Sequence, residues 1–174
     1  MFAPPRLAIA LGSNLPQGDR PPAEILNLAV DRLGQLPTIA SLQVSAWHRT
    51  APIGPPQPDY VNGCAIATLQ DSATIEPVEF LHQLQAIENE FGRERRERWG
   101  ARTLDLDLIL WGDRQIDTPE LTVPHPRWRD RAFVLVPLAE IAPDWEDPET
   151  GETVAVLVKK CDASGVRQLE SPCK

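Results

Sequence analysis

The nine residues TLDLDLILW (103–111) constrain the fold more than any other part of the chain. Apolar residues recur at every second position, a period that predicts a β-strand with two unlike faces. We expect the even-numbered leucines of this strand to point into the core. Asp105 and Asp107 then share the opposite face with Ile109 and Trp111. Two residues along a strand rise by about 6.6 Å, so the two carboxylates lie side by side.

Two interpretations of these carboxylates remain open. Like charges this close are unfavourable unless a cation lies between them, and Mg²⁺ is the natural candidate. The alternative is an edge strand with a solvated face, its acids paired to nearby arginines, and the alternating pattern alone favours it. The preceding segment RERRERWGAR (93–102) adds five arginines. Carboxylates for metal and guanidinium groups for phosphate are the two halves of a magnesium–nucleotide site, although a solvated Arg/Glu loop also explains this cluster.

Composition excludes several classes of protein. The chain carries 25 acidic and 17 basic residues, a net charge of −8, which disfavours a protein that coats nucleic acid. No apolar run approaches the roughly 20 residues of a membrane span, and no signal peptide is evident at the start. The three cysteines lack CxxC spacing, which argues against a disulfide framework or structural zinc and fits a reducing cytoplasm. No P-loop or Rossmann glycine motif is present.

The order of the expected elements suggests a fold class. Hydrophobic periodicity predicts, in chain order, a strand (7–11), a helix (23–36), a β-rich segment (39–50), a strand (60–70), a helix (77–91), a strand (103–111) and a short helix (132–141). This βαββαβ order, with C-terminal additions, is that of a ferredoxin-like plait, an α+β fold whose antiparallel sheet is sandwiched by helices. No linker divides residues 1–174, so we expect a single domain with an acidic C-terminal segment (145–174) of unknown role.

Two further segments have candidate binding residues. His125 lies between prolines and precedes three arginines at alternate positions, so we expect it to contact phosphate rather than act as a base. Tyr60 and Asn62 share one face at a strand start, where a ring and a carboxamide can hold a flat heterocycle. Ordinary structural roles remain the alternative for both segments. His48 and His82 lack such surroundings, and we expect both to be structural.

Four sequence blocks together resemble one known family, that of 6-hydroxymethyl-7,8-dihydropterin pyrophosphokinase. They are LGSNL (11–15), RTAPIGPPQPDYVN (49–62), RWGARTLDLDLILWG (98–112) and LTVPHPRWRDRAFVLVPLAEIAPD (121–144). The resemblance covers about residues 6–144, and RTLDLD is its most specific part. It implies a cytoplasmic enzyme of folate biosynthesis that transfers pyrophosphate from ATP to the pterin hydroxymethyl group and releases AMP. It also implies a monomer with small-molecule substrates, and no nucleic-acid or membrane partner.

The resemblance also implies roles for individual residues. The aspartates that match the family's ligands for two Mg²⁺ ions are Asp105 and Asp107. The arginines that match transition-state stabilisers are Arg93 and Arg102. The matching nucleotide contacts are Gln85, Glu88, Arg93, Arg95, Arg102, Leu108, Thr122, His125 and Arg131. The residues that match the pterin pocket are Thr50, Ile53, Tyr60, Asn62, Trp99 and Phe133. Tyr60 and Phe133 would sandwich the ring, and Asn62 would hydrogen-bond its edge.

Three features depart from the family pattern, and two other function classes remain open. Ala51 replaces a common proline, Glu120 stands where some members have arginine, and the segment beyond about Asp144 matches poorly. A non-catalytic plait could bind a phosphorylated ligand or single-stranded nucleic acid through its arginines. A metal-dependent phosphohydrolase would share the paired aspartates without a pterin pocket. In the pyrophosphokinase, we expect the loops 12–20, 51–59 and 92–101 to close over the substrates.

Overall fold

The computed structural model describes residues 5–70, 75–92 and 100–170. Its main feature is a six-stranded sheet in the order β5-β1-β4-β3-β8, with β2 also pairing with β4, and each of these pairings is antiparallel. The sheet strands are β1 (Arg6–Ser13), β2 (Ile39–Val44), β3 (His48–Thr50), β4 (Tyr60–Leu69), β5 (Asp105–Trp111) and β8 (Arg167–Gln168). A separate short hairpin is formed by β6 (Ile116–Asp117) and β7 (Thr122–Val123).

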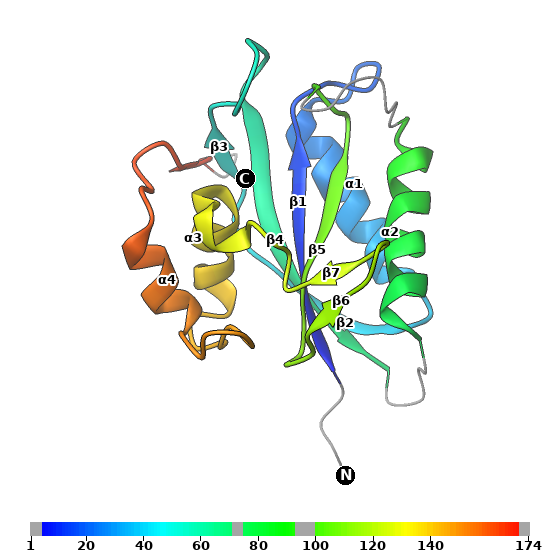
Figure 1. The fold of residues 1–174 in the computed structure, drawn as a ribbon. Helices are drawn as coiled ribbons and strands as arrows, with labels where there is room; N and C mark the ends of the chain where they lie inside the picture. The colour runs from blue at the N-terminus through cyan, green and yellow to red at the C-terminus, as the bar shows by residue number, and fades with distance from the viewer. Residues whose placement is uncertain (1–4, 71–74, 93–99, 171–174) are drawn as a thin grey trace.

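Helices cover both faces of this sheet (Figure 1). They are α1 (Pro22–Gly34), α2 (Pro77–Glu90), α3 (Ala132–Ile141) and α4 (Val154–Lys160), with a 3₁₀ turn at Trp128–Asp130. One core cluster lies between the sheet and the pair α1 and α2, and a second lies between the sheet and the pair α3 and α4. The expectation of an α+β fold with an antiparallel sheet is confirmed.

Local sequence explains where the helices begin. Pro22 and Pro77 occupy the first turns of α1 and α2, where a missing backbone N–H costs nothing. A capping box at the start of α2 pairs Glu76 with Glu79, and the Glu79 carboxylate accepts the backbone N–H of Glu76 at 3.1 Å. The expected helices at 23–36 and 77–91 therefore agree with the structure to within two residues, and the helix at 132–141 agrees at both ends.

The faces of β5 differ from the simple alternation expected from its sequence. Ile9 of β1 lies opposite Leu108, but Ala8 lies opposite Leu110, so Ile109 is an additional residue in β5. This bulge reverses the alternation beyond it. Leu110 consequently packs on the side of α3 and α4, whereas Trp111 packs on the side of α1 and α2. The predictions that Leu110 shares a face with the preceding leucines, and Trp111 a face with the aspartates, are wrong.

The C-terminal segment is more structured than its weak sequence pattern suggested. Val154 and Leu157 of α4 are buried in the second core cluster. Beyond α4, β8 pairs with β3 through His48 and Gln168 and so extends the sheet. No helix within the described ranges is long and apolar enough to cross a membrane.

Candidate active site

A cavity of about 420 Å³ lies where β1 ends and β4 and β5 begin, next to the start of α3. Its lining includes ten residues expected from the sequence: Thr50, Ile53, Tyr60, Asn62, Arg102, Asp105, Asp107, His125, Arg131 and Phe133. These residues come from five separate segments of the chain, which the antiparallel sheet brings to one end. The paired aspartates precede the bulge in β5, so the expectation that they share one face is confirmed by their place in one cavity.

One side of the cavity presents aromatic rings and a fixed carboxamide. Asn62 is 6% exposed, and its Nδ2 donates to the Oγ1 of Thr50 at 2.6 Å. Gly12 permits this arrangement, because a Cβ atom there would lie 2.9 Å from the Asn62 Oδ1. Tyr60 and Phe133 line the same cavity. This side therefore has the groups needed to stack on a flat ring and hydrogen-bond its edge.

In the same lining each aspartate pairs with an arginine. Asp105 Oδ1 accepts from Arg102 Nη1 at 2.7 Å, and Asp107 Oδ2 accepts from Arg131 Nη1 at 3.2 Å. Burial opposes the charge on Arg102, but the charge of Asp105 and its hydrogen bond outweigh this effect and raise the guanidinium pKa. Arg102 thus remains cationic beside Asp105.

His125 is held beside Asp107 through its backbone. Its N–H donates to the carbonyl of Ile109, the additional residue of β5, at 2.9 Å. Its Nε2 lies 4.0 Å from Asp107 Oδ2. Burial, with the positive charges of Arg131 and Arg127, lowers the pKa of His125 to about 4. The imidazole is therefore neutral near pH 7 and can donate or accept a hydrogen bond there.

The donor set fits a magnesium ion that is shared with a ligand. Among the described residues there is no group of three or more His, Cys, Asp or Glu side chains that could by itself hold a metal. Asp105 and Asp107 offer two carboxylates on one wall of the cavity. Mg²⁺ commonly binds through one or two carboxylates and completes its octahedron with water and phosphate. These two residues suit that role when a polyphosphate supplies the other ligands.

Several expected nucleotide contacts lie away from the cavity lining. Glu88 is 1% exposed, and its carboxylate accepts the Leu106 N–H at 2.7 Å, so it supports the edge strand β5. Leu108 is buried in the core beneath α1 and α2. Gln85 lies on α2 and Thr122 on β7, and neither lines the cavity. Their contacts with nucleotide stay predictions. Three further expected site residues lie outside the described residues: Arg93, Arg95 and Trp99.

Sequence analysis missed Asn14, which links three segments around the cavity. Asn14 is 2% exposed, and its Oδ1 accepts the Arg102 N–H at 2.8 Å. Its Nδ2 donates to Gln57 Oε1 and to the Pro58 carbonyl, each at 3.0 Å. The Gly-Ser-Asn sequence predicts a turn and, more weakly, a phosphate-binding loop, but not these contacts, because the partners are more than 40 residues away. Arg127 and Asp130 also line the cavity without having been assigned to the site.

The two histidines expected to be structural have such roles. His48 is buried, and its Nε2 pairs with Glu140 Oε1 at 2.8 Å, which ties β3 to α3. His82 pairs at the surface with Glu120, the residue that stands where some family members have arginine.

Comparisons with known proteins agree with this geometry. A model of the family described as 7,8-dihydro-6-hydroxymethylpterin-pyrophosphokinase matches residues 8–143. A Synechocystis protein named 2-amino-4-hydroxy-6-hydroxymethyldihydropteridine pyrophosphokinase is 48% identical over 161 residues, covering 91% of this chain and 77% of its own length. A Pseudomonas aeruginosa protein of the same name is 42% identical over 165 residues, covering 94% of this chain and 96% of its own.

The fold also matches that of a solved structure. The crystal structure of Plasmodium falciparum HPPK-DHPS with pteroate has a TM-score of 0.68 at 12% identity, over 92% of this chain. This chain spans 43% of that longer one, and at such low identity the match shows the fold alone. The family model and the two relatives, in contrast, agree over most of the sequence. The chain therefore belongs to the 7,8-dihydro-6-hydroxymethylpterin-pyrophosphokinase family.

Proposed function

We propose that this protein transfers the terminal pyrophosphoryl group of ATP to the hydroxymethyl oxygen of 6-hydroxymethyl-7,8-dihydropterin in folate biosynthesis. The hydroxyl oxygen forms a bond to the β-phosphorus, the bond from that phosphorus to the α-phosphate oxygen breaks, and AMP leaves. The hydroxyl proton is lost to solvent. One observation carries the proposal: a single cavity is lined both by aromatic rings with a carboxamide and by aspartates paired with arginines.

The charged wall has the groups that phosphoryl transfer requires. Such transfer depends on positioning and on neutralising charge more than on covalent catalysis. A bound triphosphate carries about four negative charges, and Arg102, Arg127 and Arg131 face the space it would occupy. Two Mg²⁺ ions, held by Asp105 and Asp107, would polarise the phosphoryl oxygens and lower the pKa of the attacking hydroxyl. Arg93 and Arg95 would add further phosphate contacts, and Arg93 and Arg102 would stabilise the transition state.

The aromatic wall accounts for the choice of acceptor. Tyr60 and Phe133 sandwich the pterin ring, while Asn62 hydrogen-bonds its edge and Thr50 holds the carboxamide in place. Ile53, which is 65% exposed on the loop after β3, and Trp99 complete the pocket when the ring is bound. Burial of a large apolar side chain on binding contributes roughly 1.5–3 kcal/mol.

The finer description of the fold and its setting is also proposed here. The strand order β5-β1-β4-β3, with α1 and α2 on one face of the sheet, supports a ferredoxin-like plait in one domain, with residues 6–144 as its family-like core. Reduced Cys64 and Cys161 support a cytoplasmic location. The protein is proposed to act as a monomer, which sedimentation analysis would test.

Release of AMP from ATP, measured with and without the hydroxymethyl-dihydropterin, tests the function. We expect release to require both the pterin and Mg²⁺. Steady hydrolysis of ATP without a pterin would instead identify a metal-dependent phosphohydrolase. Calorimetric titration with ATP adds a second criterion, because a protein that binds phosphate through arginines alone needs no metal. Equal ATP affinity with and without Mg²⁺, together with no AMP release, would contradict the proposal.

A further inference from the structure

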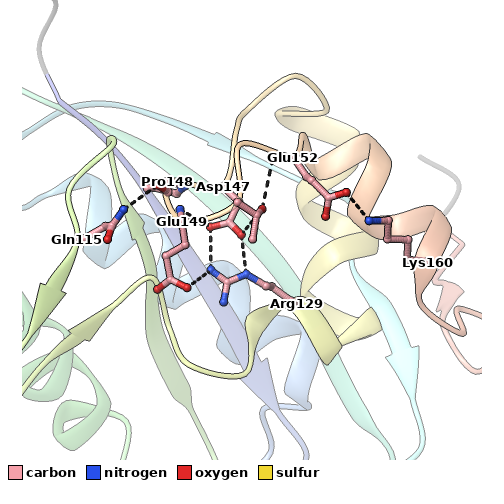
Figure 2. A network of polar contacts seen from close by, with 8 residues as sticks. Gln115, Arg129, Asp147, Pro148, Glu149, Glu152 and Lys160 are labelled. Carbon is pink, nitrogen blue, oxygen red and sulfur yellow. Dashed lines mark hydrogen bonds and ion pairs between the residues drawn. The ribbon is translucent and has the colours of Figure 1, made fainter.

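The C-terminal segment forms a short hairpin that lies against the 3₁₀ turn beside the cavity (Figure 2). An isolated bridge between Glu146 and Thr153 closes the hairpin, and the Asp147 N–H donates to the Glu152 carbonyl at 2.9 Å. Gly151 makes the turn possible with a φ of 71°, a left-handed conformation. The sequence pattern left this segment without a role, so its contacts with the rest of the molecule are informative.

Asp147 is the centre of this hairpin. Its side chain has no exposed surface, yet its two oxygens accept four hydrogen bonds. Arg129 Nε donates to Oδ2 at 2.5 Å and Arg129 Nη2 to Oδ1 at 2.8 Å, a bidentate pair. The Thr150 hydroxyl donates at 2.8 Å and the Glu149 N–H at 3.1 Å. Burial opposes ionisation, but the bonds from Arg129 and Thr150 outweigh it and keep the carboxyl pKa below its usual value.

Arg129 bonds to two carboxylates of the hairpin. In addition to the two bonds to Asp147, its Nη2 donates to Glu149 Oε2 at 2.7 Å. Figure 2 shows the guanidinium group between these two carboxylates. Two parallel N–H···O bonds fix a planar guanidinium in direction as well as distance. The Arg129 backbone is therefore fastened to the C-terminal segment at one orientation.

Three of the residues that flank Arg129 in sequence line the cavity. Arg127, Asp130 and Arg131 all face it, and Arg131 also bonds to Asp107. Trp128 is fully buried in the second core cluster, so it faces away from the cavity, as Arg129 does. Two adjacent side chains on the side away from the cavity thus hold the 3₁₀ turn, Trp128 by apolar packing and Arg129 by ion pairs. On the cavity side, Arg127 and Arg131, which flank the turn, present their guanidinium groups to the proposed phosphate site.

We propose that Asp147 is a positioning residue for the nucleotide. Through its bidentate pair with Arg129 it fixes the position of the 3₁₀ turn, and the flanking residues Arg127 and Arg131 reach the phosphates from there. This inference rests on the proposed function. It gives the C-terminal segment a role in the site, although none of its residues between 145 and 170 lines the cavity. Among the residues proposed to hold the pterin, Thr50, Tyr60 and Asn62 lie on β3 and β4 and so do not depend on this contact, whereas Phe133 lies at the start of α3 just beyond the turn.

Asp147→Asn tests the inference, with two control variants in the same segment. Leu157→Ala removes buried apolar contacts of α4 without touching Arg129, and Glu152→Gln removes the surface pair with Lys160. In Asp147→Asn we expect the KM for MgATP to rise about tenfold and the KM for the pterin to change by less than about twofold. Both controls should keep a normal KM for MgATP below their unfolding temperatures.

Hydrogen exchange on the ligand-free protein measures the turn itself. The N–H groups of Trp128, Asp130 and Arg131 bond within residues 125–131. We expect them to exchange about tenfold faster in Asp147→Asn but not in the controls. Arg129→Lys, which keeps the charge but loses the bidentate geometry, should produce the same changes to a smaller degree, and it replaces Asp147→Asn should that variant not fold.

Several outcomes would overturn the inference. Unchanged exchange in the turn would show that Asp147 does not hold it, and faster exchange with a normal KM for MgATP would show that its position does not matter for the nucleotide. An equal rise in the KM for MgATP in Leu157→Ala would reduce the effect to general destabilisation. A wild-type protein that releases no AMP would contradict the proposed function separately, since the exchange experiment needs no substrate.

Discussion

Each carboxylate of the proposed metal site faces a guanidinium group from a different part of the chain. Arg102 precedes β5 and pairs with Asp105, whereas Arg131 precedes α3 and pairs with Asp107. These ion pairs match the alternative interpretation of the strand, in which its acids pair with nearby arginines. They also suit a site that exchanges partners, because a polyphosphate with Mg²⁺ offers each group a counter-charge. The same residues can thus balance charge in the free protein and bind ligands in the complex.

Replacing either aspartate tests the proposed metal ligation. We expect Asp105→Asn and Asp107→Asn to lower kcat/KM by more than about a hundredfold, because changes that only reorient a metal ligand already cost 10–100-fold. Circular dichroism should show an intact fold. Asp113→Asn is the matched control, since Asp113 is exposed beyond the far end of β5. Near-normal turnover of either site variant with MgATP would contradict the proposed metal ligation.

Arg102 is expected to act on the chemical step more than on binding. In Arg102→Ala, single-turnover rates should fall by roughly 10²–10³, while the Kd for MgATP rises less than about tenfold. The reason is that the negative charge on the bridging oxygen is absent in the bound substrate and develops in the transition state. Single-turnover kinetics combined with calorimetry separate the two effects. A change confined to affinity would contradict this role.

His125 should make stability depend on pH in mild acid. Its pKa of about 4 in the folded protein lies below the ordinary value of 6.5, so the unfolded chain binds the proton more tightly. Stability is therefore highest above pH 6.5 and declines as the pH falls toward 4, by at most about 3 kcal/mol. The free energy of unfolding, measured with urea at several pH values across this range, should depend less on pH in His125→Gln than in the wild type. An NMR titration midpoint for His125 near 6.5 would contradict the expectation.

At the scale of elements, loops that are distant in sequence are fastened together through Asn14. It joins the end of β1 to the segment 51–59 and to the residue that precedes β5 by three positions. Two of these segments, 12–20 and 51–59, were expected to close over the substrates, and Arg102 directly follows the third expected loop, 92–101. A buried amide that satisfies partners in all three segments sets their relative position before any ligand binds.

Replacing Asn14 should both destabilise the protein and impair the site. Asn14→Ala leaves a partly buried backbone N–H of Arg102 without its acceptor, which costs about 1 kcal/mol. We also expect kcat/KM to fall about tenfold or more, because Arg102 is displaced. Chemical denaturation and steady-state kinetics measure the two effects. Asn27→Ala, which removes an exposed bond to Trp47, is the control, and an Asn14 variant no worse than this control would show that the links are dispensable.

At the scale of the whole molecule, the C-terminal segment completes the second core. Without α4, the side of α3 and β4 that carries Leu138 and Ile66 would lose its apolar cover from Val154 and Leu157. Burial of apolar surface is the main favourable contribution to folding. The segment therefore supports the fold as well as, in our inference, the 3₁₀ turn.

Two truncations on α4, one of a buried leucine and one of an exposed valine, test how this helix packs. Leu157→Ala should lower the free energy of unfolding by about 2–4 kcal/mol, because it leaves a cavity in the core. Val156→Ala, on the same helix but 39% exposed, should stay within about 0.5 kcal/mol. Denaturant unfolding at constant temperature measures both. Equal effects of the two variants would mean that α4 does not pack as described.

The sequence by itself determined the long helices, the main strands and many of the residue types that meet at the site. Periodicity located both long helices and the main strands, since amphipathic patterns record which side of an element is buried. The alternating aspartates and the Tyr60–Asn62 pair indicated the two walls of the cavity. These signals are local, so they are visible within a few residues of one another.

Only the tertiary structure decided how distant segments combine. The additional residue in β5 depends on its pairing with β1, and it alone sends Leu110 and Trp111 to unexpected faces while offering the Ile109 carbonyl to His125. The hydrogen bonds of Asn14 and the ion pair of Asp147 with Arg129 likewise join residues that are 18–88 positions apart. Hydrogen bonds and ion pairs over such separations leave no periodic trace in the sequence, because their geometry exists only once the sheet and both helical layers have packed.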